Sequence, residues 1–160
     1  MNEERDVFFI EVQKIRQLWV QVIIFLPLAL VFWHWNDLIK HPITLIFPLM
    51  MGILCPVLIY LSNLRTEIRR DGLYFRFFPY HLSFCKINLS DIDKYEARTY
   101  RPIMEYGGWG IRYSLRYGKA YNVSGNLGIQ LVLKNGSKIL FGSQKPEEFV
   151  EALKKVLSTS

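Results

Sequence analysis

The stretch Leu140–Leu157, LFGSQKPEEFVEALKKVL, decides how the chain ends and what its last helix covers. A β-prone apolar segment stops at a glycine, a short polar turn follows, and a proline opens an amphipathic helix. Proline suits the first helical position because its missing N–H would have no partner there. Glutamates in the first turn complement the positive end of the helix dipole. The stretch therefore predicts a last strand, an elbow and a C-terminal helix that lays its apolar stripe on a sheet.

The same turn, Gly142–Lys145, also allows a second interpretation, because backbone N–H groups at a helix start can capture an anion. Neither a G-x-x-x-x-G-K-[ST] pattern nor a G-x-G-x-x-G pattern occurs there, so no phosphate cradle of a known kind is indicated. The elbow is the favoured interpretation.

Upstream of the elbow, from residue 64 onward, the residue pattern is that of strands. Asp71-Gly72 and Asn135-Gly136 each lie between β-prone runs, which is the pattern of a tight hairpin turn. Residues 110–117, GIRYSLRY, alternate between apolar and polar side chains. About seven antiparallel strands followed by one helix predict an α+β domain with a bent sheet or barrel that the helix closes.

Two apolar runs precede these strands, Leu18–Trp35 with 18 residues and Ile43–Leu61 with 19. At 1.5 Å per residue each would reach about 27–29 Å, close to the hydrocarbon thickness of a bilayer. The linker between them is short, which predicts an antiparallel transmembrane hairpin over residues 18–63. Basic residues flank its open end, so both chain termini are expected in the cytoplasm of a multi-pass cell-membrane protein.

The first 17 residues form an amphipathic N-terminal segment. Phe8, Val12 and Ile15 recur at helical spacing, which predicts a helix that lies on the membrane surface or packs on the strand-rich domain.

The elbow wording also carries a family resemblance. A meander of about seven strands ending in ILFGSQKPEEFVEAL resembles the bacterial pleckstrin-homology (PH-like) domains, many of which end a strand in a Gly-Ser/Thr-Gln turn and open the capping helix with Pro-Glu-Glu/Asp. Two preceding spans resemble the membrane-anchored small proteins of that group. The resemblance implies a PH-like bent antiparallel barrel of about seven strands over residues 64–160, capped by the C-terminal helix, and implies almost nothing about function.

Charge is distributed unevenly along the chain. Residues 1–63 hold four Lys/Arg and five acids, net −1, whereas residues 64–160 hold sixteen and nine, net +7. A basic domain beside a bilayer indicates attraction to anionic lipid head groups, at about 1 kcal/mol per well-placed cation. We expect Arg65, Arg69 and Arg70 to bind lipid, although cations directly after a span are also explained by topology alone. No nucleic-acid partner is predicted for a tethered domain.

The segment 95–128 is rich in Tyr, Arg and Gly, the first two of which are common in interface hot spots. The residues that we predict to bind a protein partner are Arg98, Arg101, Trp109, Arg112 and Arg116. The alternative is structural, because alternating tyrosines can form a core and glycines allow sharp corners.

Catalysis finds little support in the sequence. The three histidines are dispersed, and no Ser-His-acid set or metal-ligand spacing is present. We therefore predict no enzyme, no catalytic residue, no metal and no cofactor. The leading hypothesis is a membrane-anchored, cytoplasm-facing binding or assembly module that engages a protein partner or a second copy of itself. The alternatives are a sensor of anionic lipid head groups and, more weakly, a subunit of an oligomeric membrane enzyme or transporter.

Overall fold

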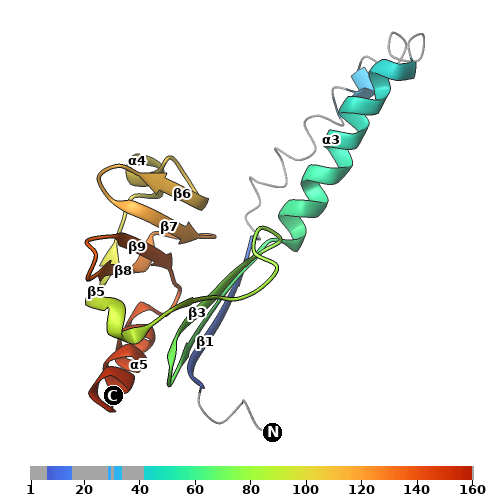
Figure 1. The fold of residues 1–160 in the computed structure, drawn as a ribbon. Helices are drawn as coiled ribbons and strands as arrows, with labels where there is room; N and C mark the ends of the chain where they lie inside the picture. The colour runs from blue at the N-terminus through green and yellow to red at the C-terminus, as the bar shows by residue number, and fades with distance from the viewer. Residues whose placement is uncertain (1–6, 16–28, 30, 34–41, 160) are drawn as a thin grey trace, which may run out of the picture. The chain divides into compact units, whose positions relative to one another are not determined.

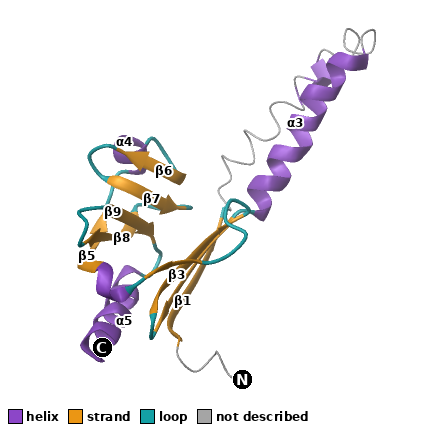
Figure 2. Cartoon of the chain, in the orientation of Figure 1, coloured by secondary structure: helices purple, strands orange, loops and turns teal. Residues whose placement is uncertain are grey.

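The computed structural model describes residues 7–15, 29, 31–33 and 42–159 (Figures 1 and 2). The chain divides into two compact units. One unit combines Met1–Lys14 with Asn63–Ser160, and the other is Ile15–Ser62. The strand-rich unit is thus built from two pieces of chain that lie far apart in the sequence.

The first sheet of the strand-rich unit has four antiparallel strands in the order β1-β2-β3-β4. Their bounds are β1 (Val7–Lys14), β2 (Asn63–Arg69), β3 (Gly72–Phe78) and β4 (Cys85–Ile87). The N-terminal segment supplies the edge strand β1, whose Lys14 pairs with Asn63 at the start of β2. The segment Ile15–Ser62 therefore leaves and rejoins the sheet at two paired residues.

The second sheet has five strands in the order β5-β8-β9-β7-β6. Their bounds are β5 (Ile92–Thr99), β6 (Gly110–Ser114), β7 (Gly118–Asn122), β8 (Leu127–Leu133) and β9 (Lys138–Gly142). The 3₁₀ helix η2 (Leu89–Asp91) precedes β5, and the short helix α4 (Pro102–Tyr106) separates β5 from β6. All pairs are antiparallel except β7 with β9, which run parallel.

The core lies where the inner faces of the two sheets and helix α5 (Pro146–Thr159) meet. On α5 the buried side chains recur at the spacing of one helix face, at Phe149, Ala152, Leu153 and Val156. The ring of Phe149 lies 5.1 Å from that of Phe9 on β1. Across the sheets, the Phe75 ring contacts the rings of Tyr121 at 4.7 Å and Phe141 at 4.9 Å. Aromatic side chains thus join both sheets and the helix.

The predicted PH-like bent barrel is wrong as a description of this fold. The described strands form two separate sheets, and no pairing among them closes either sheet into a barrel. The parallel pair β7–β9 also breaks the expected antiparallel meander. The C-terminal helix does begin at Pro146 as predicted.

The predicted N-terminal helix is also wrong, because Val7–Lys14 is a strand. In this strand, buried and exposed positions alternate, but two of the buried side chains are polar and several of the exposed ones are apolar. Glu11 and Gln13 face the core beside Phe9, while Ile10 and Val12 face outward and are about half exposed. Inward-facing polar residues removed the period-two signal, and the remaining apolar residues matched a helical spacing by chance.

The other unit contains α3 (Pro42–Leu61), which carries the second apolar run. In the parts of the chain that the structure describes, no helix combines the length and the apolar character that a membrane crossing needs. The predicted transmembrane hairpin is therefore wrong, and so is the multi-pass cell-membrane localisation that rests on it. The length of an apolar run identifies only candidates for a membrane crossing. Pro48 and Pro56 lie inside α3, which continues through both. Most of the first run lies outside the described residues.

Candidate functional site

The Gly-Ser-Gln turn before α5 is held from within the chain, by β1. Glu11, which is 8% exposed, accepts hydrogen bonds from the Ser143 hydroxyl (2.6 Å) and from the Gln144 backbone N–H (2.7 Å). Gln13 donates its side-chain amide to the Gly142 carbonyl at 2.7 Å. Glu11 thus occupies the place that an external anion would take, and the turn is an elbow rather than a binding loop.

The tyrosine-rich segment 95–128 is largely structural. Tyr100, Tyr106 and Tyr121 are 1%, 5% and 3% exposed. The first two belong to a small core cluster with Ala120 and Leu140. Burial raises the pKa of the Tyr100 phenol to about 12, although the hydrogen bond that it accepts from Asn122 favours its ionised form. These tyrosines therefore follow the structural alternative that the sequence allowed.

Two of the predicted partner-binding arginines lie around Glu105 of α4. Arg98 forms an ion pair with Glu105 (2.8 Å) and donates hydrogen bonds to Gln130 on β8, so it fastens α4 to the sheet. The Arg101 side chain is exposed, and its backbone N–H donates to Glu105 at 2.8 Å. Partial burial opposes ionisation of Glu105, but the hydrogen bonds from Arg98 and the Arg101 backbone outweigh it and lower the carboxyl pKa.

Trp109 and Arg112 are joined to each other. The Trp109 indole N–H donates to the Gly125 carbonyl at 2.9 Å, which holds the ring to the β7–β8 loop. The Arg112 Nε donates to the Trp109 carbonyl at the same distance, and Arg112 is an exposed residue. Trp109 is therefore a partly buried anchor of its loop, and Arg112 is the more accessible of the two.

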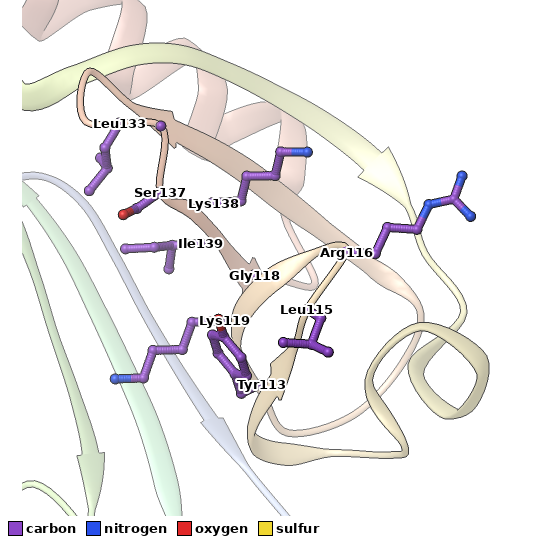
Figure 3. A pocket seen from close by; sticks show the side chains of 10 residues that line it. Tyr113, Leu115, Arg116, Gly118, Lys119, Leu133, Ser137, Lys138 and Ile139 are labelled. Carbon is purple, nitrogen blue, oxygen red and sulfur yellow. The ribbon is translucent and has the colours of Figure 1, made fainter.

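A groove of about 480 Å³ lies between the β6–β7 hairpin and the β8–β9 hairpin (Figure 3). Tyr113 and Leu115 line it from one hairpin and are 71% and 96% exposed. Leu133 and Ile139 line it from the other. The parallel pairing of β7 with β9 brings the two hairpins together, so the apolar centre of the groove is assembled from distant parts of the sequence.

The rim of this groove is cationic. Arg116, Lys119 and Lys138 contribute to the lining, and no carboxylate does so among the residues that the structure describes. Figure 3 shows the ends of Arg116 and Lys119 pointing to opposite sides of the hairpin. The groove adjoins β6, whose outer side pairs with no strand in the described part of the chain. An apolar centre, a charged rim and an open strand edge are together the features of a peptide-binding surface.

Sequence comparison places the chain in a family. Residues 2–159 match the family described as "Family of unknown function (DUF6141)". The chain belongs to the DUF6141 family. No curated protein and no solved structure shows significant similarity to it. The family match covers nearly the whole chain and is not to PH-like domains, so the resemblance drawn from the elbow wording is wrong. That wording describes a strand-to-helix elbow, which unrelated folds share.

In this DUF6141 protein, the outer face of the first sheet carries an arginine cluster, which we define as Arg65, Glu67, Arg69, Arg76 and Phe84. The carboxylate of Glu67 is 1% exposed and pairs with Arg65 through one oxygen and with Arg69 through the other. All three guanidinium carbons lie 5.1–5.8 Å from the centroid of the Phe84 ring. Three cations and one acid give the cluster a net charge of +2.

The cluster contains two of the three residues predicted to bind lipid, together with one that the sequence analysis missed. Arg65 and Arg69 belong to it, whereas Arg70 is an exposed residue of the β2–β3 turn. Arg76 was missed because it lies in the middle of a strand. Its place was nevertheless predictable, since a two-residue turn at Arg70-Asp71 sets a register that pairs Arg76 with Arg65.

A second ion pair, Lys86 with Asp71, lies at the β2–β3 turn. Lys86 and Tyr74 both donate to the same oxygen of Asp71, each at 2.6 Å. The hydrogen bond from Lys86 lowers the pKa of the Asp71 carboxyl and raises that of Lys86 itself. Asp71 is thereby engaged with Lys86 and adds no carboxylate to the arginine cluster. Among the described residues, no group of His, Cys, Asp and Glu side chains is arranged to hold a metal ion.

Proposed function

We propose that this chain is a protein-binding module that takes up an extended, acidic segment of a partner protein beside β6. The observation that carries the proposal is the outer edge of β6, which pairs with no other described strand and lies next to a groove whose charged lining residues are all cationic. Main-chain hydrogen bonds along such an edge supply affinity, and pockets for alternate side chains supply specificity.

The exposed apolar side chains support binding rather than a purely structural role for the hairpin. Leu115 is 96% exposed at a turn, where a polar residue would fold equally well. Tyr113 is 71% exposed two residues earlier. An alternating partner segment would place apolar side chains against this pair and carboxylates toward the cationic rim.

Charge also favours a different protein over a second copy of this one. A second copy would bring the same cationic rim to the groove, and like charges facing one another in an interface disfavour association. The chain as a whole carries a net charge of +6, which adds to this repulsion. The proposed occupant is therefore an acidic segment of another protein.

The test uses the full chain and short fluorescent peptides followed by fluorescence anisotropy. One peptide alternates Glu with Val, and its control replaces every Glu by Lys. We expect the acidic peptide to bind about tenfold more tightly than the basic one, with an affinity that falls as salt is added. Equal affinity for the two peptides, or no binding of either, refutes the proposal.

Variants locate the site. The double variant Arg116→Glu/Lys138→Glu changes only exposed side chains of the rim and should reverse the peptide preference. The matched control, Lys94→Glu/Lys154→Glu, makes the same change of charge on β5 and α5 and should leave the preference as it is.

Hydrogen exchange then examines the strand edge, since a bound peptide should protect the backbone amides of β6. Protection confined to another strand would count against edge binding.

A further inference from the structure

We propose that the arginine cluster on the outer face of the first sheet is a binding site for a phosphate group. The site is distinct from the groove beside β6, and the inference does not depend on the proposed function. It rests on one unfavourable arrangement in the sheet, one guanidinium that has no counter-charge among the residues the structure describes, and the chemistry of the side chains.

The unfavourable arrangement is the pairing of Arg65 with Arg76, which lie directly opposite each other on β2 and β3. Like charges at directly opposed positions of an antiparallel pair destabilise it. Glu67 relieves Arg65, because its carboxylate binds the Arg65 Nε at 2.5 Å. The other oxygen of the same carboxylate is taken by Arg69. Both oxygens of Glu67, the single acid of the cluster, are therefore bound to arginines other than Arg76.

Arg76 is left with a buried polar atom that has no partner. Its Nε is inaccessible to solvent and has no hydrogen-bond partner within the described structure. The Arg76 guanidinium instead stacks over Phe84, with its carbon 5.1 Å from the ring centroid. This cation–π contact holds the group against the ring and leaves its terminal nitrogens to bind an anion. A rigid, uncompensated guanidinium beside two others is an arrangement that an anion would stabilise.

Phosphate is the anion that this chemistry favours. The planar fork of the Arg76 guanidinium matches two phosphate oxygens, and Arg65 and Arg69 on the same face of the sheet add positive charge beside it. The net charge of +2 matches that of a phosphate monoester near neutral pH. Anions can reach the cluster, because the Arg65 and Arg69 side chains are 39% and 29% exposed.

The first test is thermal unfolding of the full chain with inorganic phosphate, against chloride at equal ionic strength. Phosphate at ten times its Kd should raise the melting temperature of the wild type by about 3–6 °C. The charge-matched control Lys94→Gln should show the same rise. Arg76→Gln should show none, and without phosphate it should be at least as stable as the wild type, because it removes the opposed charges.

Two results would overturn the proposal. One is the absence of any phosphate-specific rise in the wild type. The other is an equal rise in Arg76→Gln, which would place the binding elsewhere. A loss of stability in Arg76→Gln without phosphate would also count against the proposal, because it would show that Arg76 stabilises the sheet by its contact with Phe84. If Arg76→Gln does not fold, titration of the wild type with phosphate, followed by the NMR signals of Arg65, Arg76 and Phe84, decides the matter, since unchanged signals at all three exclude the site.

A second arm distinguishes the source of the phosphate. Vesicles of phosphatidylcholine with added phosphatidic acid are compared with pure phosphatidylcholine vesicles by co-sedimentation. Binding to the former alone, reduced by inorganic phosphate and by Arg76→Gln, supports the site with a lipid head group as its source. A phosphate-dependent rise in melting temperature without vesicle binding supports the site with a free phosphate ester as its source. Vesicle binding that Arg76→Gln leaves unchanged counts against the site.

Discussion

Replacing Glu11 by alanine should destabilise the strand-rich unit more than any other single change on β1 that keeps the apolar core intact. Glu11 joins β1 to the elbow before α5, 132 residues away, through the Ser143 hydroxyl and the Gln144 N–H. A hydrogen bond to an ionised group is worth about 1.5–3 kcal/mol, and an unpartnered buried donor costs a similar amount.

The two donors should contribute unequally to the loss. Ser143 is fully buried, so its hydroxyl cannot recover a water molecule and should account for about 1.5–3 kcal/mol. Gln144 is exposed, so water can replace part of its bond and about 1 kcal/mol should be lost there. The free energy of unfolding of Glu11→Ala should therefore fall by about 2.5–4 kcal/mol. Glu11→Gln keeps one acceptor and should lose about half as much.

Urea unfolding at neutral pH, followed by tryptophan fluorescence, measures these changes. Glu96→Ala removes an exposed glutamate from β5 and should stay within about 0.5 kcal/mol of the wild type. In a double-mutant cycle, Glu11→Ala and Ser143→Ala should together cost about 1–2 kcal/mol less than their sum, because each removes the same bond. A loss below about 0.5 kcal/mol in Glu11→Ala, or strict additivity of the pair, would refute this account of the elbow.

Three further predictions concern other parts of the strand-rich unit. Glu67→Gln should lower the free energy of unfolding by about 2–3 kcal/mol in a urea titration, below the range for a fully buried pair because Arg65 and Arg69 remain partly hydrated, and Glu96→Gln is the matched control. Gly118→Ala should cost at least about 2 kcal/mol, since φ is +80° and a Cβ would collide with the Lys138 backbone, whereas Gly136→Ala, with a similar φ and open space, should cost about 1 kcal/mol. The free energy of unfolding should decline at both ends of the pH range. Burial, and then the charge of Lys119, lowers the pKa of His81 in the folded protein, so stability should be lost as pH falls below about 6.5, and His81→Gln should flatten this acid decline. Burial raises the pKa of Tyr100 to about 12, so the stability that its neutral phenol contributes should be lost as pH rises above about 10. Tyr100→Phe should flatten this alkaline decline.

Local sequence signals predicted the local elements of this fold. A hairpin was predicted at Asp71-Gly72, and β2 and β3 do form one, although its two turn residues are Arg70 and Asp71 and Gly72 is the first residue of β3. Asn135-Gly136 gives the β8–β9 turn, with Gly136 at a positive φ of 81°. Pro146 opens α5 as expected. These features depend on the conformational limits of one or two residues, which a sequence shows directly. The alternation in GIRYSLRY also predicted a strand, although β6 ends at Ser114 and the next residues turn.

Long-range features were missed for a common reason. The polar residues Glu11 and Gln13 face inward only because their partners stand about 130 residues later, and nothing near them in the sequence indicates those partners. The groove beside β6 likewise depends on the parallel pairing of β7 with β9, so Lys138 and Ile139 were not connected with the segment 95–128. Of the predicted partner-binding residues, Arg116 lines the groove, while Arg98 holds α4 to the sheet.

The pairing of Lys14 with Asn63 has a mechanical consequence. Any force applied to the excursion Ile15–Ser62 reaches the sheet through these two adjacent residues at once. It would pull β1 and β2 apart from one end, so that the backbone hydrogen bonds between them break one after another instead of being loaded all at once in shear. Tension on the excursion should therefore peel β1 away at low load, and because Glu11 lies on β1, the grip on the elbow before α5 would be released in the same event.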